Sequence, residues 1–288
     1  MKNKKLLIPV LCVALALFVA GTLLLKPAKA TDTALKQKVQ NLMGNSIDNF
    51  SSAEGSFVLN TKVGKSTIDY KVRLKGVPSG YEEAKSPNGT TTVTIYDGNI
   101  NKLEKYNIEK KEYTSVKTAT GNVKSEVKEP IHDNVPYNVK DRYSMEDNVP
   151  VYQYRSNPAC MQMSRTSLFP QEAILGFLKD YNKWDITSSD KLLGYDTYVI
   201  TGDLDSYYHK KLGTKFKWWV EKNTGILLKE EIYDSTGKVT ESLETTSLKL
   251  NTNIDDKVFT KADKSEYKLV DPLKAAVEDT TKNFPNKK

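Results

Sequence analysis

Apolar side chains recur at spacings of three and four between residue 32 and about residue 53. They are Leu35, Val39, Leu42, Met43, Ile47 and Phe50. This spacing places them on one stripe of an α-helix. The Gly44-Asn45 pair lies inside the stripe, and glycine weakens a helix interior. We therefore predict one amphipathic helix with a weak point at this pair.

Six short segments that follow alternate apolar and polar positions, which is the period of a β-strand with one covered face. They span residues 57–63, 67–74, 81–85, 90–96, 100–106 and 111–116. Turn residues separate them, including Asn88-Gly89 and Asp97-Gly98, which tolerate the positive φ of tight hairpin turns. The pattern predicts an antiparallel meander.

Residues 118–167 break this rhythm, because prolines, charges, tyrosines and methionines are scattered through them without a period. Aperiodic stretches of this length inside a domain are uncommon and are usually functional or disordered. A helix is predicted over 170–181, since Pro170 suits a first helical turn and Ile174, Leu175 and Leu178 lie on one stripe.

The second half of the chain returns to strand patterns, at residues 195–202, 215–221, 226–233, 239–245 and 246–250. About eleven strands make a sheet too wide to stay flat. We predict one α+β domain with a strongly curved antiparallel sheet and helices on its concave side. A two-lobed arrangement stays open, because residues 118–167 fall between the two halves of the sheet.

The first 30 residues have the pattern of an export signal. Lys2, Lys4 and Lys5 precede the apolar run 6–25, which is followed by Ala28-Lys29-Ala30. We expect cleavage after Ala30. An uncleaved membrane anchor is the alternative, because about 20 apolar residues at roughly 1.5 Å each also span a bilayer core. Either way, residues 31–288 are expected outside the cytoplasm, secreted or anchored to the cell membrane.

The composition is that of a soluble globular protein, with 38% hydrophobic and 27% charged residues. The net charge of +7 falls to about +2 without the five lysines of the signal, which holds no acidic residue. Lysine and glutamate are interspersed along the rest of the chain, which argues against a nucleic-acid partner. Cys12 lies in the apolar run, so Cys160 is either a buried thiol or available to pair with another chain.

Candidate catalytic and metal-binding residues are scarce. His132 and His209 are the only histidines, and neither has companions that suit a catalytic triad or a zinc site. The pairs Glu82-Glu83 and Glu230-Glu231 are expected to be solvated charges that face opposite sides of a strand. We predict no enzyme, no cofactor and no metal, since an exported hydrolase would need a nucleophile and a base that we do not find.

Two adjacent tryptophans raise a question about what each of them faces. On a strand, Trp218 shares one face with Phe216 and Val220, while Trp219 lies opposite with Lys217. One interpretation is that one tryptophan joins the core while a helix or a lysine stem covers the other. The second is that one of these faces lines a hollow for an apolar ligand.

Three segments resemble hairpins of the LolA-like lipoprotein-carrier superfamily. The segment "VTIYDGNINKLEKYNIEKKEY" at 93–113 resembles its Asp-Gly hairpin, and "FKWWVEKNTGILLKEEIYDSTGKV" at 216–239 resembles its Trp-apolar-Asp, Thr-Gly and Asp-x-x-Gly hairpins. Glu221 stands where the family has Asp, and Leu227 where many members have Pro. The tail "LNTNIDDKVFT" at 250–260 is also similar. The resemblance covers residues 33–265.

This resemblance implies a half-open barrel over residues 31–265, followed by a polar C-terminal tail at 266–288. In the family, helices form a lid over an apolar cavity that accepts acyl chains. A branch similar to the RseB and MucB proteins senses lipid or lipoprotein and restrains an anti-sigma factor. The insert 118–167 is longer than a plain carrier needs, and the lysine-rich composition with a possible anchor suggests a Gram-positive source.

We therefore expect a non-enzymatic binding module that holds an acyl chain of a lipid or lipoprotein. The alternative is a regulatory protein that binds an anti-sigma factor or another membrane-bound partner. The residues predicted to line the cavity are Val93, Ile95, Leu103, Ile200, Trp218, Val220 and Leu228. Those predicted to form a lid or a partner surface are Tyr152, Tyr154, Met161 and Met163, because methionine adapts to varied apolar shapes.

Overall fold

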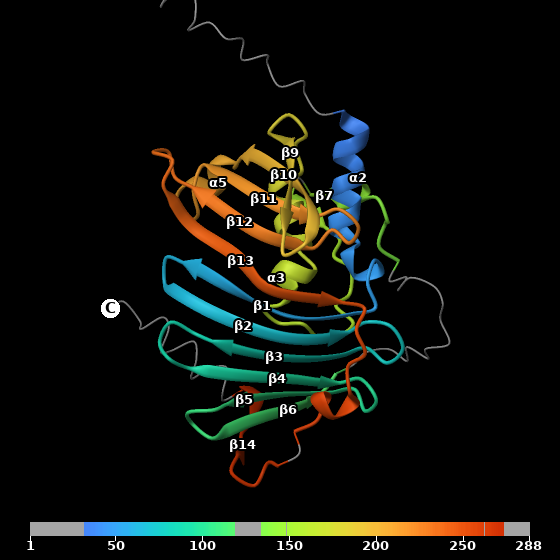
Figure 1. Ribbon diagram of the computed structural model, residues 1–288, viewed down its shortest axis with the longest axis vertical. Coiled ribbons are helices and arrows are strands. Elements are labelled where there is room, and N and C mark those ends of the chain that lie inside the picture. Colours follow the sequence, from blue (N-terminus) through green and yellow to red (C-terminus); the bar gives the residue numbers. More distant parts are fainter. Residues whose placement is uncertain (1–31, 119–133, 148, 262, 274–288) are drawn as a thin grey trace, which may run out of the picture. The chain divides into compact units, whose positions relative to one another are not determined.

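The computed structural model describes residues 32–118, 134–147, 149–261 and 263–273 (Figure 1). The predicted signal or anchor at residues 1–30 and His132 lie outside these ranges. In the described ranges, no helix combines the length and the apolar character needed to cross a bilayer.

The N-terminal helix is shorter than its apolar stripe predicts. Helix α2 spans Thr33–Gly44 and begins at Asp32, whose side chain accepts a hydrogen bond from the backbone N–H of Ala34 at 3.1 Å. The helix ends where the weak Gly44-Asn45 pair was predicted, and a short 3-10 turn, η1 (Ser46–Asp48), leads into the first strand.

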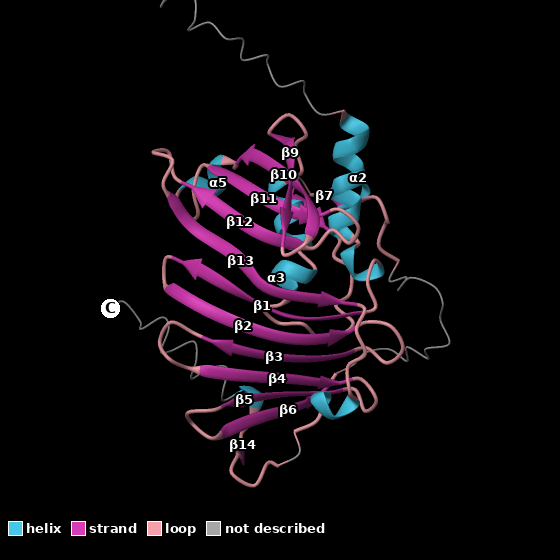
Figure 2. Ribbon diagram, viewed as in Figure 1, coloured by secondary structure: helices cyan, strands magenta, loops and turns pink. Residues whose placement is uncertain are grey.

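Twelve strands form one curved sheet that does not close, so the predicted α+β half-open barrel is confirmed (Figure 2). Its spatial order is β14-β6-β5-β4-β3-β2-β1-β13-β12-β11-β10-β9, and every pair is antiparallel except β14 with β6. The bounds are β1 (Ser52–Thr61), β2 (Gly64–Arg73), β3 (Ser79–Lys85), β4 (Thr91–Asp97), β5 (Lys102–Asn107), β6 (Glu112–Lys117), β9 (Trp184–Leu192), β10 (Tyr195–Asp203), β11 (Lys215–Glu221), β12 (Leu227–Tyr233), β13 (Val239–Leu250) and β14 (Lys268–Leu269).

Three strands differ from the prediction. The predicted strands 239–245 and 246–250 are one strand, β13, whose register with β1 skips Thr246. Such a bulge inverts the alternation and therefore imitates a strand boundary in the sequence. Strand β9 was missed because most of its residues are polar and exposed, and the short β14 falls in the predicted polar tail.

The sheet face that meets the helices carries two clusters of buried side chains. The first cluster lies against the segment 159–169, which includes α3 (Arg165–Leu168), and contains Phe57, Ile68, Met161, Leu228 and Leu243 among others. The second lies against α2 and α4 (Gln171–Phe177) and contains Val39, Ile174, Ile200, Trp218 and Val220 among others. Helix α4 is shorter than the predicted 170–181, although Tyr181 still packs on the second cluster.

Most of the described part of the insert is tied to this face. It contains η2 (Val139–Arg142) and a small hairpin of β7 (Tyr143–Glu146) and β8 (Val149–Tyr152). Buried Arg142 donates to the carbonyl of Gly44 at 3.0 Å, and buried Arg155 pairs with Asp48 at 2.6 Å. These contacts hold the insert against the end of α2.

Candidate functional site

An apolar row crosses the helix-facing side of six strands. Successive cross-strand partners place side by side Leu59 on β1, Leu243 on β13, Glu230 on β12, Trp218 on β11, Ile200 on β10 and Ile186 on β9. Directly opposed residues on neighbouring strands share a face and contact each other. Glu230 is the single charged residue in this row, which we call the concave row.

Short helices cover the concave row. Phe177 at the end of α4 stacks on Trp218 with ring centroids 5.5 Å apart. Tyr208, on the four-residue helix α5 (Ser206–His209), meets Phe177 edge-on at 5.1 Å. Both Phe177 and Tyr208 are half-buried, as is Leu212 beyond α5. Over Trp218, the cover is therefore made of small elements that contact one another and the row through aromatic rings.

Glu230 is held in an environment that favours its neutral form. The indole N–H of Trp218 donates to its Oε2 atom at 2.6 Å. Burial raises the pKa of the Glu230 carboxyl to about 7, against the hydrogen bond from Trp218, and nearby Glu241 raises this pKa further. The prediction that Glu230 is a solvated surface charge is therefore wrong.

Glu82 is more deeply buried than the half-buried Glu230, with 4% of its surface exposed, and it accepts hydrogen bonds from the backbone N–H groups of Met163 and Ser164 at 2.9 and 2.8 Å. It fixes the entry to α3. The prediction that Glu82 is solvated is wrong, whereas the predicted opposite orientation of Glu82 and Glu83 is confirmed by the register. Nothing in the local sequence distinguishes Glu82 or Glu230 from a glutamate that is exposed to solvent.

The two adjacent tryptophans divide between core and cover. Trp218 is fully buried in the second cluster. Trp219 lies on the other face, where the ammonium groups of Lys217 and Lys229 stand 4.6 and 4.7 Å from its ring and its indole N–H donates to Asp190 at 3.1 Å. The interpretation of one core tryptophan and one tryptophan covered by lysine stems is confirmed.

The turn after these tryptophans is fixed by a buried carboxylate. Glu221 accepts hydrogen bonds from the backbone N–H groups of Asn223 and Thr224 and from the Thr224 hydroxyl, at 2.6 to 3.0 Å. Gly225 adopts a φ of 79°, and a side chain there would meet the carbonyl of Leu42. The "EKNTG" motif thus seats the β11–β12 hairpin against α2.

The seven residues predicted to line a cavity do not meet in one place. Ile200, Trp218 and Val220 share the second cluster, and Leu228 lies in the first. Leu103 is half-buried and lies on the same face of the sheet by register. Val93 and Ile95 lie on the opposite face, since Ile95 opposes Tyr81 and Tyr81 opposes Lys71. Alternation identifies two faces of a strand but does not say which one meets the helices.

The four residues predicted for a lid or a partner surface also divide. Met161 is buried in the first cluster, and Met163 packs against it. Tyr152 meets Tyr143 edge-on at 5.3 Å, and Tyr154 is 47% exposed. Tyr154 is therefore the member of this set that is most available to a partner.

Ligands for metals are not clustered in the described ranges, where no group of three or more His, Cys, Asp or Glu side chains is placed to hold an ion. The Nε2 atom of His209 lies 2.8 Å from the carbonyl oxygen of Leu204. Cys160 is half-buried, and burial raises the pKa of its thiol.

No protein-family model matches the chain, and no curated protein sequence matches it either. Solved structures do match, and they include families that the hairpin motifs resemble. MucB of Pseudomonas aeruginosa, in a complex with MucA, is 12% identical with a TM-score of 0.43; the match covers 82% of this chain and 63% of MucB. Lipoprotein LppX of Mycobacterium tuberculosis is 10% identical with a TM-score of 0.38; the match covers 78% of this chain and 99% of LppX.

An uncharacterized conserved protein from Thermus thermophilus is 10% identical with a TM-score of 0.42, and the match covers 81% of this chain and 99% of that one. MucB, a protein to which the hairpin motifs point, is thus among the solved structures that this chain is similar to.

Proposed function

We propose that this protein is an extracytoplasmic, non-enzymatic binding module that holds an acyl chain of a lipid or lipoprotein against the concave row. The observation that carries the proposal is the row across six strands, apolar except for Glu230 and covered by helices instead of a second sheet. Each methylene removed from water contributes about 0.8 kcal/mol, so burial alone supplies the affinity. The export pattern of residues 1–30 supports the location.

Binding of an acyl chain on Trp218 requires the cover to move, because Phe177 stacks on the Trp218 ring. Tyr208 packs edge-on against Phe177 from α5. Helices of four and seven residues have little stability of their own, so α5 depends on its ring contact and α4 on its ring contacts and on buried Ile174 and Leu175. An acyl chain that replaces the Phe177 ring on Trp218 would cover the same apolar surface.

Two adjacent positions on β1 give a matched test. Leu59 opposes Leu243 on the concave side, whereas Val58 opposes Glu244 and faces the other way. Both side chains are half-buried, so a lysine stem at either position can reach solvent. We expect Leu59→Lys to abolish uptake of a fluorescent fatty acid while Val58→Lys retains it. Equal uptake by the two variants would contradict the proposal.

A second candidate function is a regulatory protein that binds a membrane-bound partner such as an anti-sigma factor. The observation in its favour is the exposure of large apolar side chains on the insert, with Tyr137 at 64%, Met145 at 63% and Tyr154 at 47%. Tyrosine and methionine are enriched in protein interfaces. If this function holds, Met145→Glu with Tyr154→Glu will release a partner that is cross-linked to the wild-type protein in membranes, without changing fatty-acid uptake.

A further inference from the structure

The face of the sheet opposite the concave row carries an apolar patch at one end. A sheet packed on one side is normally polar on the other. On β1 and β2 this convex face is polar, since Glu54 lies beside Lys71. On β3, β4 and β5, however, cross-strand pairs place Tyr81 beside Ile95 and Val93 beside Tyr106. At this end of the sheet the convex face therefore carries an apolar cluster of its own, which includes Val93, Ile95 and Tyr106.

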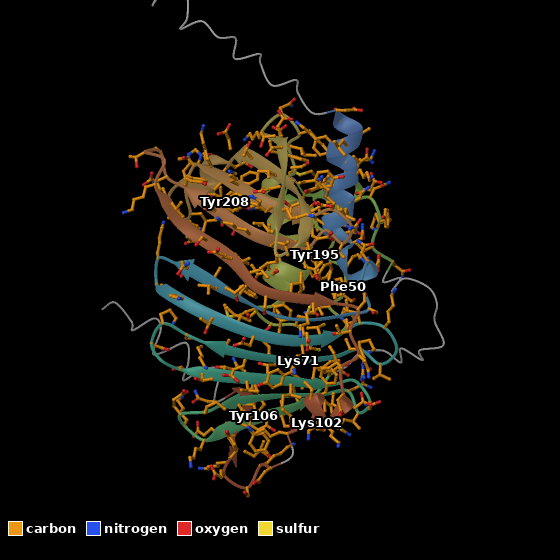
Figure 3. All side chains as sticks on the ribbon, in the orientation of Figure 1. Phe50, Lys71, Lys102, Tyr106, Tyr195 and Tyr208 are labelled. Carbon is orange, nitrogen blue, oxygen red and sulfur yellow. The ribbon has the colours of Figure 1, made fainter. Side chains whose placement is uncertain are left out.

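The C-terminal segment crosses this patch as a roof. Tyr267 meets Tyr106 edge-on at 5.2 Å, and Lys264 pairs with Glu104 at 2.7 Å. Figure 3 labels Tyr106 at the end of the sheet that carries β14. At the other end of the roof, η3 (Asp256–Phe259) places the Phe259 ring 5.0 Å from the guanidinium of Arg73. Strand β14 then pairs with β6. The roof is thus fixed to the sheet on both sides of the patch.

The roof does not fill the space beneath it. A hollow of about 550 Å³ remains, with Val93, Ile95 and Ile108 lining it from the sheet side and Val258 and Tyr267 from the roof. This volume lies in the range of small-molecule sites in proteins. Val93 and Ile95 are only 5% and 4% exposed, so neighbouring side chains cover most of the surface of this apolar floor.

Three charged residues line the hollow, and they are Glu83, Lys85 and Lys261. Glu83 is neutralised there by Lys85 at 3.3 Å and accepts a hydrogen bond from Tyr81 at 3.2 Å. The ammonium of Lys261 stands 5.3 Å from the ring of Tyr106 and 4.8 Å from that of Tyr267. No carboxylate of the described residues lies within ion-pair distance of Lys261, although it is half-buried.

We propose that this hollow is a second ligand site, which binds a single-chain amphiphilic carboxylate. The chain lies on Val93, Ile95 and Ile108, and the carboxylate pairs with the ammonium of Lys261. A charge-assisted hydrogen bond at an apolar rim provides both affinity and selectivity for an anion. The site lies on the other face of the sheet from the concave row and is independent of the function proposed for that row.

Calorimetric titration of dodecanoate and dodecanol into wild type and Lys261→Met tests the proposal, because methionine keeps an apolar stem and removes the charge. We expect about tenfold weaker binding of dodecanoate and unchanged binding of dodecanol. Lys257→Met is the matched control, since Lys257 is exposed on the same segment and does not line the hollow. Equal loss for both ligands, or no loss for either, overturns the proposal.

Photolabelling with a diazirine analogue of dodecanoate separates the two sites. Labels on residues 81–95 or 258–267 support the convex hollow. Labels confined to residues 163–178 and 216–232 overturn this inference while supporting the acyl site on the concave row. If the convex peptides are labelled in Leu59→Lys as in wild type, the convex site stands even where the concave site fails.

Discussion

Trp218 and Glu230 are cross-strand partners on β11 and β12, and the Trp218 indole donates a hydrogen bond to the Glu230 carboxylate in the middle of an apolar row. Because the pKa of this carboxyl is about 7, the charge on the concave side of the sheet changes with pH near neutrality. The carboxyl also lies beside the ring of Trp218 on which Phe177 stacks, so its charge state bears on the helix cover.

Stability should fall as pH rises because of Glu230. Its folded-state pKa is about 7 against an ordinary value of 4.5, so the folded protein holds this proton more tightly than the unfolded chain does. The contribution is complete below about pH 4.5 and is lost by about pH 7, with a magnitude of roughly 2–3 kcal/mol.

Chemical denaturation at pH 5 and pH 8 measures this dependence. In Glu230→Gln most of the decline should disappear, while Glu231→Gln, which changes the neighbouring residue on the opposite face, should retain it. A pH dependence in Glu230→Gln that parallels that of the wild type would show that Glu230 is not the group responsible.

Glu221 should stabilise the folded protein through the several hydrogen bonds that it accepts in the β11–β12 turn. Glu221→Ala leaves the N–H groups of Asn223 and Thr224 and the Thr224 hydroxyl without their acceptor. We expect the free energy of unfolding to fall by about 2–4 kcal/mol in urea titrations. Glu244→Ala, at an exposed position of β13, should change it by less than about 0.5 kcal/mol. A similar small change in both variants would refute the cap.

The buried ion pair of Arg155 and Asp48 should hold the insert in place. Arg155→Met leaves the Asp48 carboxylate, whose side chain is 14% exposed, without its guanidinium, at a cost of about 3 kcal/mol. Hydrogen exchange over residues 149–168 should accelerate. Arg165→Met removes an exposed pair with Glu172 and should change neither the stability nor the hydrogen exchange. Unchanged exchange in Arg155→Met would mean that other contacts hold the insert.

The lysine stems over Trp219 should shield its indole ring. Replacing both Lys217 and Lys229 with serine should increase the quenching of tryptophan fluorescence by acrylamide, because Trp184 and Trp218 are already buried elsewhere. In a Trp219→Phe background the same two replacements should have no effect. An equal increase in that background would place the change at another tryptophan.

Periodicity predicted the sheet well because most strands have one covered and one wet face, so that hydrophobic burial imposes a period of two. It failed where that condition fails. Strand β9 is polar along most of its length, and the skipped Thr246 inverts the period inside β13. Val93 and Ile95 were assigned to the same cavity as Trp218, since alternation does not identify which face the helices cover.

The candidate site was less accessible to sequence reasoning than the fold. The buried roles of Glu82 and Glu230 depend on partners 81 and 12 residues away, Met163 and Trp218. Tyr267 covers the convex patch by packing on Tyr106, and these two residues are even farther apart in the chain. Such long-range pairings follow from the order of strands in the sheet and leave no local pattern.

Native mass spectrometry of residues 31–288 purified from a bacterial host, with extraction of bound lipid, tests the binding function most directly. The account predicts a co-purified acyl lipid in wild type and in Val58→Lys, and its loss in Leu59→Lys. A protein that carries no lipid and takes up no fatty acid, or equal lipid in both variants, would contradict the assignment of the concave row as the ligand site.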